Sequence, residues 1–235
     1  GGKTIIFSYI SQNVIKKSKK VLIITDRNEL LMQAGGTISK FDLEPSYVKA
    51  GSKYIDHRRD VYIAMSQTLR NRVQIKEYVD WIKNDIDLVI IDECHGQEFN
   101  YLFESGLFDD KLVIGVTATP SRKGKMRQLG LDYDRIVRGP SVKQLVKEGY
   151  LVNCDIYDFE SPSMKGATID SKTGDFALKD MFSRFDKPKL YNGIINQHKN
   201  ICNNEKTLVF CCNVEHAVNT CIEFSKNGIP VKFLA

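Results

Sequence analysis

The sequence predicts an α/β fold built on a doubly wound parallel sheet, and three observations predict it. Short apolar runs of strand length alternate with longer segments that have helical apolar spacing. The runs are apolar throughout, as strands buried on both faces are. Polar clusters follow four of the runs directly, at 25–28, 66–68, 92–95 and 117–120. Because the carboxyl ends of parallel strands meet at one edge, these clusters are expected to converge on one rim of the sheet.

The predicted elements follow one another with short connections through the first 116 residues. A helix with a wide apolar face is expected from residue 4 to residue 15. Strands are expected at 21–24, 47–48, 61–65, 88–91 and 111–116, and further helices at 29–34, 69–83 and 99–105. Asp26 or Asn28 is expected to cap the helix at 29–34, and Gly35 with Gly36 to end or loosen it.

The character of the chain changes after residue 120, and a second α/β domain begins. The basic run at 122–127 is read as a solvated loop, with contact to a nucleic-acid backbone as the alternative. A helix capped by Ser141 and ended by Gly149 comes first. Then follow an extended segment at 151–159, a polar hairpin or loop at 160–180, helices at 188–203 and 214–227, and strands at 207–212 and 231–234. We therefore place the first domain at 1–140, and a connecting segment with the beginning of a second domain at 141–235.

Composition narrows the class of protein. Hydrophobic residues make up 42% and charged residues 27%, as in ordinary globular proteins. No apolar run approaches the ~20 residues of a membrane span and no signal peptide is visible, so we expect a cytoplasmic protein, or one in the host cytoplasm if it is phage-encoded. The net charge of +5 permits a polyanionic partner without requiring one. Six cysteines without a Cys-x-x-Cys pair argue against zinc and for reduced thiols.

The first four residues have the chemistry of the end of a phosphate loop. In Gly1-Gly2-Lys3-Thr4, glycine lets the backbone approach a phosphate, lysine reaches the terminal phosphates, and the threonine hydroxyl suits magnesium. Only the last part of the pattern G-x-x-x-x-G-K-[ST] is present. An ordinary helix start is therefore the alternative, and we expect the chain to be a fragment cut inside the loop.

Two adjacent acids, Asp92 and Glu93, directly follow the apolar run at 88–91. Such carboxylates repel unless a cation lies between them and a substrate, and magnesium bound to nucleotide phosphates supplies one. Phosphoryl transfer needs charge neutralisation and a positioned water, which a lysine, a hydroxyl and two acids can provide. A glycosidase pair suits them less, because its carboxyls face each other across ~5 Å or more. Alone, the stretch is equally a solvated acidic turn.

Six motifs occur in a fixed order along the chain. They are Gly-Lys-Thr at 2–4, Thr-Asp-Arg at 25–27, Ser-Gln-Thr-Leu at 66–69, Asp-Glu-Cys-His at 92–95, Thr-Ala-Thr-Pro at 117–120 and Leu-Val-Phe-Cys at 208–211. This order resembles superfamily 2 helicases and translocases over almost the whole chain, with a DECH box. It implies a RecA-like domain followed by the start of a second RecA-like domain. Thr-Asp-Arg, Thr-Ala-Thr and the phrase at 148–151 are closer to restriction-type, phage and DNA-repair motors than to DEAD-box RNA helicases.

The resemblance implies ATP and Mg²⁺ as cofactors and assigns roles at the nucleotide site. Glu93 would orient and deprotonate the attacking water, with Asp92 and Lys3 as the other catalytic groups. Thr4 and Asp92 would bind the metal. The residues that would hold the nucleotide and its metal are Gly1, Gly2, Lys3, Thr4, Asp92 and Glu93.

The resemblance also assigns roles in coupling and in nucleic-acid binding. His95 would link the nucleotide site to Thr117 and Thr119, which couple hydrolysis to the grip on nucleic acid. Short hydroxyls, amides and one arginine would contact the sugar–phosphate backbone without reading sequence. These residues are Thr25, Arg27, Gly51, Ser66, Gln67 and Thr68.

The function that follows is an ATP-dependent helicase or translocase that moves along or remodels a strand or duplex. DNA is favoured as the partner, single-stranded or branched. A motor subunit of a restriction complex and an RNA helicase are the alternatives. A small-molecule kinase is disfavoured because Thr-Ala-Thr-Pro follows the acidic box, and a non-catalytic clamp because Lys3, Asp92 and Glu93 are retained. The arginines that the family inserts from its second domain are absent, so the 235-residue chain alone is expected to hydrolyse ATP poorly or not at all.

Overall fold

The computed structural model describes residues 2–52, 54–121, 127–159, 161–171, 174–202 and 205–234. Gly1 and residues 122–126 of the basic run therefore lie outside the described residues. The chain divides into two compact units, Gly1–Gly139 and Pro140–Ala235, and each is described by itself below.

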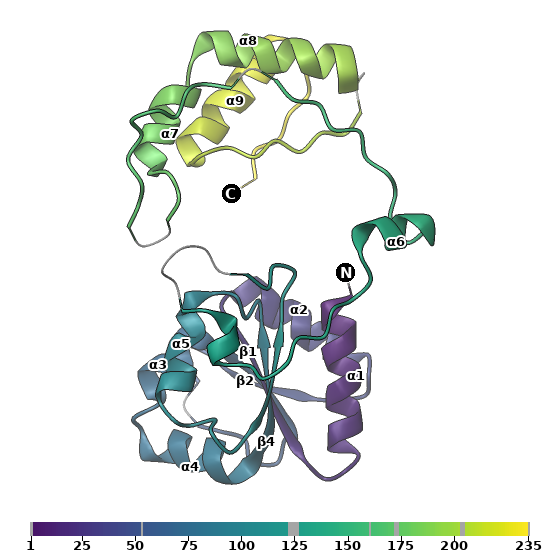
Figure 1. The fold of residues 1–235 in the computed structure, drawn as a ribbon, viewed down its shortest axis with the longest axis vertical. Helices are drawn as coiled ribbons and strands as arrows, with labels where there is room; N and C mark the ends of the chain where they lie inside the picture. The colour runs from purple at the N-terminus through teal and green to yellow at the C-terminus, as the bar shows by residue number, and fades with distance from the viewer. Residues whose placement is uncertain are drawn as a thin grey trace. The chain divides into compact units, whose positions relative to one another are not determined.

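The first unit contains one five-stranded sheet in which every pair of neighbours is parallel (Figure 1). In chain order the strands are β1 (Lys20–Thr25), β2 (Pro45–Val48), β3 (Val61–Met65), β4 (Ile86–Asp92) and β5 (Leu112–Val116). Their order across the sheet is β2-β3-β1-β4-β5. The central strand β1 is hydrogen-bonded on both sides, with Val21 level with Val61 of β3 and with Leu88 of β4. The predicted α/β class with a parallel sheet is confirmed.

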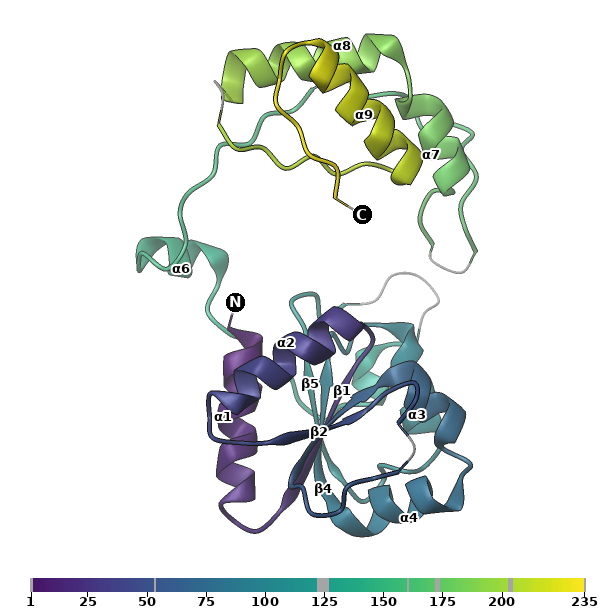
Figure 2. The same cartoon turned by 180° about the vertical axis from the view of Figure 1, so that it is seen from behind.

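Helices cover both faces of this sheet. On one face lie α1 (Lys3–Ile15) and α2 (Asn28–Ser39); on the other lie α3 (Ser66–Arg72), α4 (Lys76–Asp85) and α5 (Asn100–Glu104), as Figures 1 and 2 show together. Alternate residues of β1 enter the two cores, with Val21 and Ile23 on the first face and Leu22 and Ile24 on the second. All four are 0% exposed, and each fully buried side chain stabilises the fold by roughly 1.5–3 kcal/mol.

The helix α2 differs from its prediction at both ends. Its N-cap residue is Arg27, and no side chain caps it, so the expected cap by Asp26 or Asn28 is wrong. The helix also runs through the glycine pair to Ser39 instead of ending there. Gly35 has a packing role, because a Cβ at this position would lie 2.0 Å from the hydroxyl oxygen of Tyr47. A glycine in a helix often marks such a close approach, which composition alone does not reveal.

The single helix predicted at 69–83 is two helices, α3 and α4. The first begins at Ser66, so the polar residues that follow β3 form its first turn. The chain is extended at Ile75, with φ −82° and ψ 121°, and this residue separates the helices. Beyond β4, the 3₁₀ turn η1 (Gln97–Phe99) leads into α5, and η2 (Leu129–Leu131) follows β5.

The second unit is helical in the residues that the structure describes. It contains α6 (Val142–Lys147), α7 (Leu178–Phe185), α8 (Pro188–Gln197), a π-helical turn (His198–Cys202) and α9 (Val214–Lys226). Ser141 caps α6 as predicted, its hydroxyl oxygen accepting a 3.2 Å hydrogen bond from the Gln144 amide. Gly149 follows with φ +79°. Among the described residues, none of the helices has the length and apolar character needed to cross a membrane.

The strands predicted at 207–212 and 231–234 are wrong. Both segments lack regular secondary structure, as does the extended segment 151–159. Apolar side chains of the first segment are exposed to solvent: Leu208 is 68% and Phe210 89% exposed. Within the described part of this unit, one antiparallel bridge, between Ile169 and Phe176, is the sole β pairing. A strand needs neighbours for its backbone groups, and the described residues give these segments none.

Candidate nucleotide and nucleic-acid site

The first turn of α1 and the end of β4 meet at the carboxyl edge of the sheet. The Lys3 ammonium donates to the carboxylate of Glu93, a residue 90 positions away. Gly2, the N-cap of α1, has φ +71° and open space where a Cβ would be. No side chain caps this helix and no acid lies in its first turn. Its free amides, the helix dipole and Lys3 together make this corner suitable for an anion.

The backbone at Glu93 is in the left-handed region, with φ +50°. This conformation costs a non-glycine residue on the order of 1–3 kcal/mol and is concentrated at functional sites. Two hydrogen bonds hold the turn: the Cys94 amide donates to the Val116 carbonyl at 3.1 Å, and the Gly96 amide donates to the Glu93 carbonyl at 3.0 Å. The turn therefore fixes the Glu93 side chain at the rim, where it meets Lys3.

Asp92 lies behind this pair and is only 8% exposed. Burial raises the pKa of its carboxyl, the Lys3 charge lowers it, and the neighbouring charges of Glu93 and Asp26 raise it again. The Glu93 amide donates to Asp92 Oδ1 at 3.0 Å. Nearby, Asp26 Oδ1 is buried with no hydrogen-bond partner in the described part of the chain. The charges of these two neighbouring acids disfavour the ionised form of Asp92, which a cation bound at this position would stabilise.

A polar chain connects Glu93 with the segment that follows β5. His95 Nδ1 lies 3.4 Å from Glu93 Oε2 and 2.8 Å from the hydroxyl oxygen of Thr117. The Thr119 amide in turn donates to Thr117 Oγ1 at 3.0 Å. The structure therefore brings together the three residues for which the sequence predicts a coupling role, and it places them in contact with the acidic box.

A groove of about 420 Å³ lies where β2 and β3 end, beside the start of α2. Seven residues line it: Asn28, Lys49, Ala50, Met65, Gln67, Thr68 and Asn71. Gln67 and Thr68 are there as predicted, and Gly51, with φ +85°, follows the lining residue Ala50. The amides, the hydroxyl and the single cation are groups that bind a sugar–phosphate backbone.

Three polar groove residues, besides the apolar Ala50 and Met65, are missing from the predicted nucleic-acid contacts. Asn28 belongs to the polar cluster after β1, yet was read only as a helix cap. Asn71 lies one helical turn after Gln67 and Thr68, so the spacing of α3 would have revealed it. Lys49 precedes the Gly51 turn and carries no motif signal.

The remaining residues predicted to contact nucleic acid differ in how far their side chains are exposed. The Arg27 side chain is 72% exposed and lies 3.6 Å from Asp26. Thr25 and Ser66 are buried, at 1% and 3% exposed, and Ser66 donates to the Glu98 carbonyl. In this structure the two hydroxyls face the interior, so they offer no surface to a phosphate.

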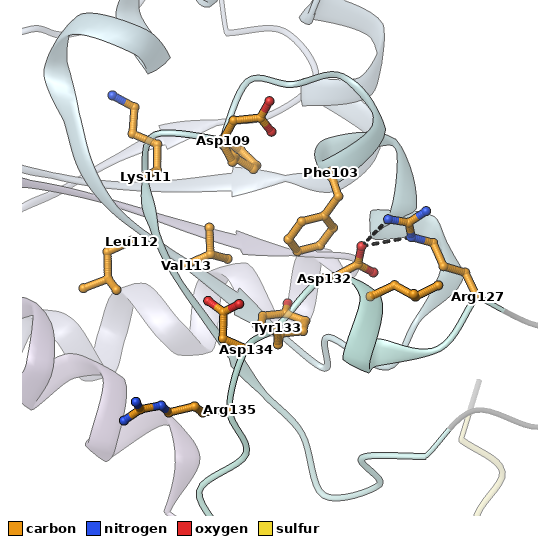
Figure 3. Close-up of a pocket in the computed structure, with 12 residues that line it drawn as sticks. Phe103, Asp109, Lys111, Leu112, Val113, Arg127, Asp132, Tyr133, Asp134 and Arg135 are labelled. Carbon is orange, nitrogen blue, oxygen red and sulfur yellow. Dashed lines mark hydrogen bonds and ion pairs between the residues drawn. The ribbon is translucent and has the colours of Figure 1, made fainter.

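A larger cavity, of about 540 Å³, lies beside the edge strand β5 (Figure 3). Arg127 donates to Asp132 across it, and the Phe103 and Tyr133 rings meet edge to face, 5.4 Å apart between centroids. Apart from Arg127, the last residue of the basic run, none of the residues predicted for the nucleotide or nucleic-acid site lines this cavity. The described site residues gather instead at the rim and in the groove.

Comparison with known families agrees with the motifs. Residues 1–122, about half of the chain, match the family described as type III restriction enzyme, res subunit. The chain belongs to this family. The match confirms the resemblance to superfamily 2 and the RecA-like character of the first sheet, and it covers the whole of that sheet.

One curated protein and two solved structures illustrate what this chain is similar to. "Putative mitochondrial ATP-dependent helicase irc3" of Schizosaccharomyces pombe is 27% identical over 99% of this chain and 39% of its own length. The chain thus spans about two fifths of that relative. The UvsW helicase of bacteriophage T4 is 19% identical, with a TM-score of 0.41 over 51% of this chain and 44% of UvsW. The Hef helicase domain of Pyrococcus furiosus is 16% identical, with a TM-score of 0.44 over 97% of this chain and 48% of Hef.

Proposed function

We propose that this chain is the ATP-hydrolysing part of a DNA helicase or translocase. The contact between Lys3 and Glu93 carries the proposal, because it unites the end of a phosphate loop with the acidic box. Family membership and the name of the yeast relative support an ATP-dependent motor. A kinase with a small-molecule acceptor would not need the His95–Thr117 connection between the acidic box and the segment that follows β5.

The residues at the rim divide the chemistry among them. Lys3 neutralises Glu93 in the structure, and we propose that nucleotide phosphates take Lys3 over and release the Glu93 carboxylate. Glu93 would then orient a water molecule and accept its proton on a carboxylate oxygen.

Magnesium suits the donor set that the structure presents. Thr4 and Asp92 would hold it, and the ion supplies charge neutralisation on the phosphates when bound. The described residues contain no group of three or more His, Cys, Asp or Glu that could hold a metal by themselves. Mg²⁺ is usually bound through one or two carboxylates together with substrate phosphates, and Asp92 would supply one of these carboxylates.

We place the nucleic acid in the groove lined by Gln67, Thr68 and Lys49, with Arg27 beside it. Single-stranded or branched DNA is the proposed partner. The preference for DNA rests on the Thr-Asp-Arg and Thr-Ala-Thr motifs, and the cytoplasmic location stays a prediction. We interpret residues 141–235 as the connecting segment and the beginning of a second RecA-like domain, supported by the Leu-Val-Phe-Cys motif at 208–211.

The test is the ATPase rate of the full-length protein that carries this chain. The rate is measured alone and with single-stranded DNA, duplex DNA, branched DNA or RNA, each at several salt concentrations. We expect stimulation by DNA and loss of turnover in Glu93→Gln. Stimulation by RNA alone would overturn the DNA assignment, and a rate indifferent to every nucleic acid would overturn the motor.

A second candidate is the motor subunit of a restriction complex, which the description of the matching family favours. It predicts ATP-dependent cleavage of duplex DNA by the full-length protein together with its associated chains. Cleavage that disappears in Glu93→Gln would support it. ATP-driven unwinding with no cleavage under the same conditions would favour the helicase instead.

A further inference from the structure

Tyr101, in α5, is hydrogen-bonded to the start of α3. Its hydroxyl donates to the Ser66 carbonyl at 2.7 Å. The Ser66 hydroxyl donates to the Glu98 carbonyl at 3.3 Å and lies 3.4 Å from the Tyr101 hydroxyl oxygen. Since Ser66 is only 3% exposed, these bonds are shielded from water. We call Tyr101, Ser66 and Glu98 the tyrosine cluster.

Ser66, at one end of the tyrosine cluster, immediately precedes two residues that line the groove. Ser66 is the first residue of α3, and Gln67 and Thr68, which follow it, line the groove. The Tyr101 hydroxyl holds the main chain at Ser66 rather than a side chain. A displacement of this first turn therefore moves the groove residues together with Ser66.

Glu98, at the other end of the tyrosine cluster, is joined by a short, packed segment to the acidic box at 92–95. The Gly96 amide closes the turn by donating to the Glu93 carbonyl at 3.0 Å. The Glu98 side chain folds back over Gly96, so closely that a Cβ there would lie 2.1 Å from Glu98 Oε1. Phe99 is 0% exposed and fixes the segment in the core. Glu98 thus stands three residues after His95 with little freedom to move independently of it.

We propose that the tyrosine cluster is a positioning device that couples the groove to the nucleotide site. It forms a second connection, separate from the one through His95 and Thr117, and it rests on the proposed function. Nucleic acid that shifts the first turn of α3 would move Glu98 and, through the Gly96 turn, the backbone that carries Glu93. Because coupling of binding is reciprocal, nucleotide would change the affinity of the groove by the same factor.

The chemistry of Tyr101 suits this role. Burial raises the pKa of its hydroxyl to about 12, so it remains a donor throughout the physiological pH range. The Arg70 guanidinium lies 5.9 Å from the centre of the ring and orients it from α3 as well. Its hydroxyl is hydrogen-bonded to Ser66, and the Ser66 hydroxyl in turn links it to the Glu98 carbonyl.

The experiment compares Tyr101→Phe with Tyr62→Phe in the full-length protein. Tyr62→Phe is the matched control, because it also removes a tyrosine hydroxyl that donates to backbone carbonyls. These are the carbonyls of Asp56 and Arg59 at the amino end of β3, away from the groove. The measurements are basal ATPase, DNA-stimulated ATPase, and DNA affinity with and without a non-hydrolysable ATP analogue. The ratio of the two affinities gives the coupling factor, which a merely structural loss does not change.

We expect Tyr101→Phe to keep the basal rate and to lower both stimulation and the coupling factor by about threefold to tenfold, which corresponds to the net free energy of one hydrogen bond. Tyr62→Phe should leave both unchanged. Equal coupling factors in Tyr101→Phe, Tyr62→Phe and the unaltered protein would overturn the inference while leaving the proposed function intact. If the unaltered protein itself showed no stimulation, the proposed function would fail first, and the coupling with it.

Discussion

Two segments with the same sequence character fold differently in this chain. Val21 to Ile24 and Leu208 to Phe210 are both apolar runs that follow lysine-containing polar stretches. The first is the centre of a sheet and is 0% exposed, whereas Leu208 is 68% and Phe210 89% exposed. β1 has a parallel strand on each side, and the later run has none in the described residues. An apolar run shows what a segment can bury, while its neighbours decide whether it becomes a strand.

The largest expected difference between the two runs is in stability. Ile23→Ala removes a side chain from a closed core and should cost roughly 2–5 kcal/mol of the free energy of unfolding. Leu208→Ala should stay within about 0.5 kcal/mol, because the side chain is already exposed. Trp81, the only tryptophan in the sequence, lies buried in the first unit, so its fluorescence in urea measures the Ile23 variant, whereas circular dichroism of the helices in both units measures the Leu208 variant. A cost at Leu208 as large as that at Ile23 would show that the later run is packed in solution.

The glycine pair in α2 allows a packed position and an open position to be compared within the first unit. Gly35→Ala should destabilise by about 1–3 kcal/mol, because the new methyl group overlaps Tyr47. Gly36→Ala is the matched control: no atom lies within 4 Å of its Cβ, and the better helix former should stabilise by roughly 0.5–1 kcal/mol. Urea midpoints followed at Trp81 measure both variants. The same sign for the two changes would contradict the packing role of Gly35.

The second unit is expected to be sensitive to acid, through His216. This side chain is 7% exposed, and its Nδ1 accepts a 3.2 Å hydrogen bond from the Cys212 amide, which an imidazolium cannot do. Burial lowers its pKa below the ordinary 6.5, although the charge of Asp186 raises it. The unfolded state therefore binds the proton more readily, and stability should fall as the pH drops through and below 6.5.

Hydrogen exchange of α9 in the full chain measures this loss. Protection should decrease between pH 7 and pH 5 in the unaltered chain, once the intrinsic pH dependence of exchange is removed. His216→Asn, which keeps a neutral acceptor, should show less of the decrease. Identical pH profiles for the two chains would exclude His216 as the cause.

The smallest effect is expected at Asp92. Its pKa is raised, chiefly by burial, so the charged carboxylate destabilises the nucleotide-free fold. Asp92→Asn should therefore raise the urea midpoint slightly at pH 7. The gain should shrink as the pH falls toward the ordinary value of 3.8, where the aspartate also becomes neutral. A lower midpoint at pH 7 would mean that attraction to Lys3 outweighs desolvation.

Much of the first unit could be predicted because its central strands β1, β3 and β4 are buried on both faces. Uniform apolar runs at β1, β3, β4 and β5 revealed the parallel sheet, and the polar residues after them revealed the rim. The burial of Thr25 and Ser66 could not be read from motifs, since a motif gives the residue type and not the direction of its side chain. Lys49 was missed because it enters the groove through tertiary folding from a segment without periodicity.

The second unit was predicted less well for a different physical reason. Its helices carry local signals, such as the Ser141 cap and Gly228 after α9, and local signals need no distant partner. A strand at 207–212 requires pairing that the sequence pattern cannot supply.

The most direct measurement is single-turnover hydrolysis of pre-bound ATP by Glu93→Gln in the full-length protein, with DNA present. Glutamine keeps the size of the side chain but cannot accept the proton of water. The account predicts nearly unaltered ATP binding and a hydrolysis rate lower by about 10²–10⁴-fold. Lys3→Ala, measured in parallel, should weaken ATP binding itself. Hydrolysis by Glu93→Gln within a few fold of the unaltered protein would contradict the assignment of Glu93 and, with it, the central role of the Lys3–Glu93 corner.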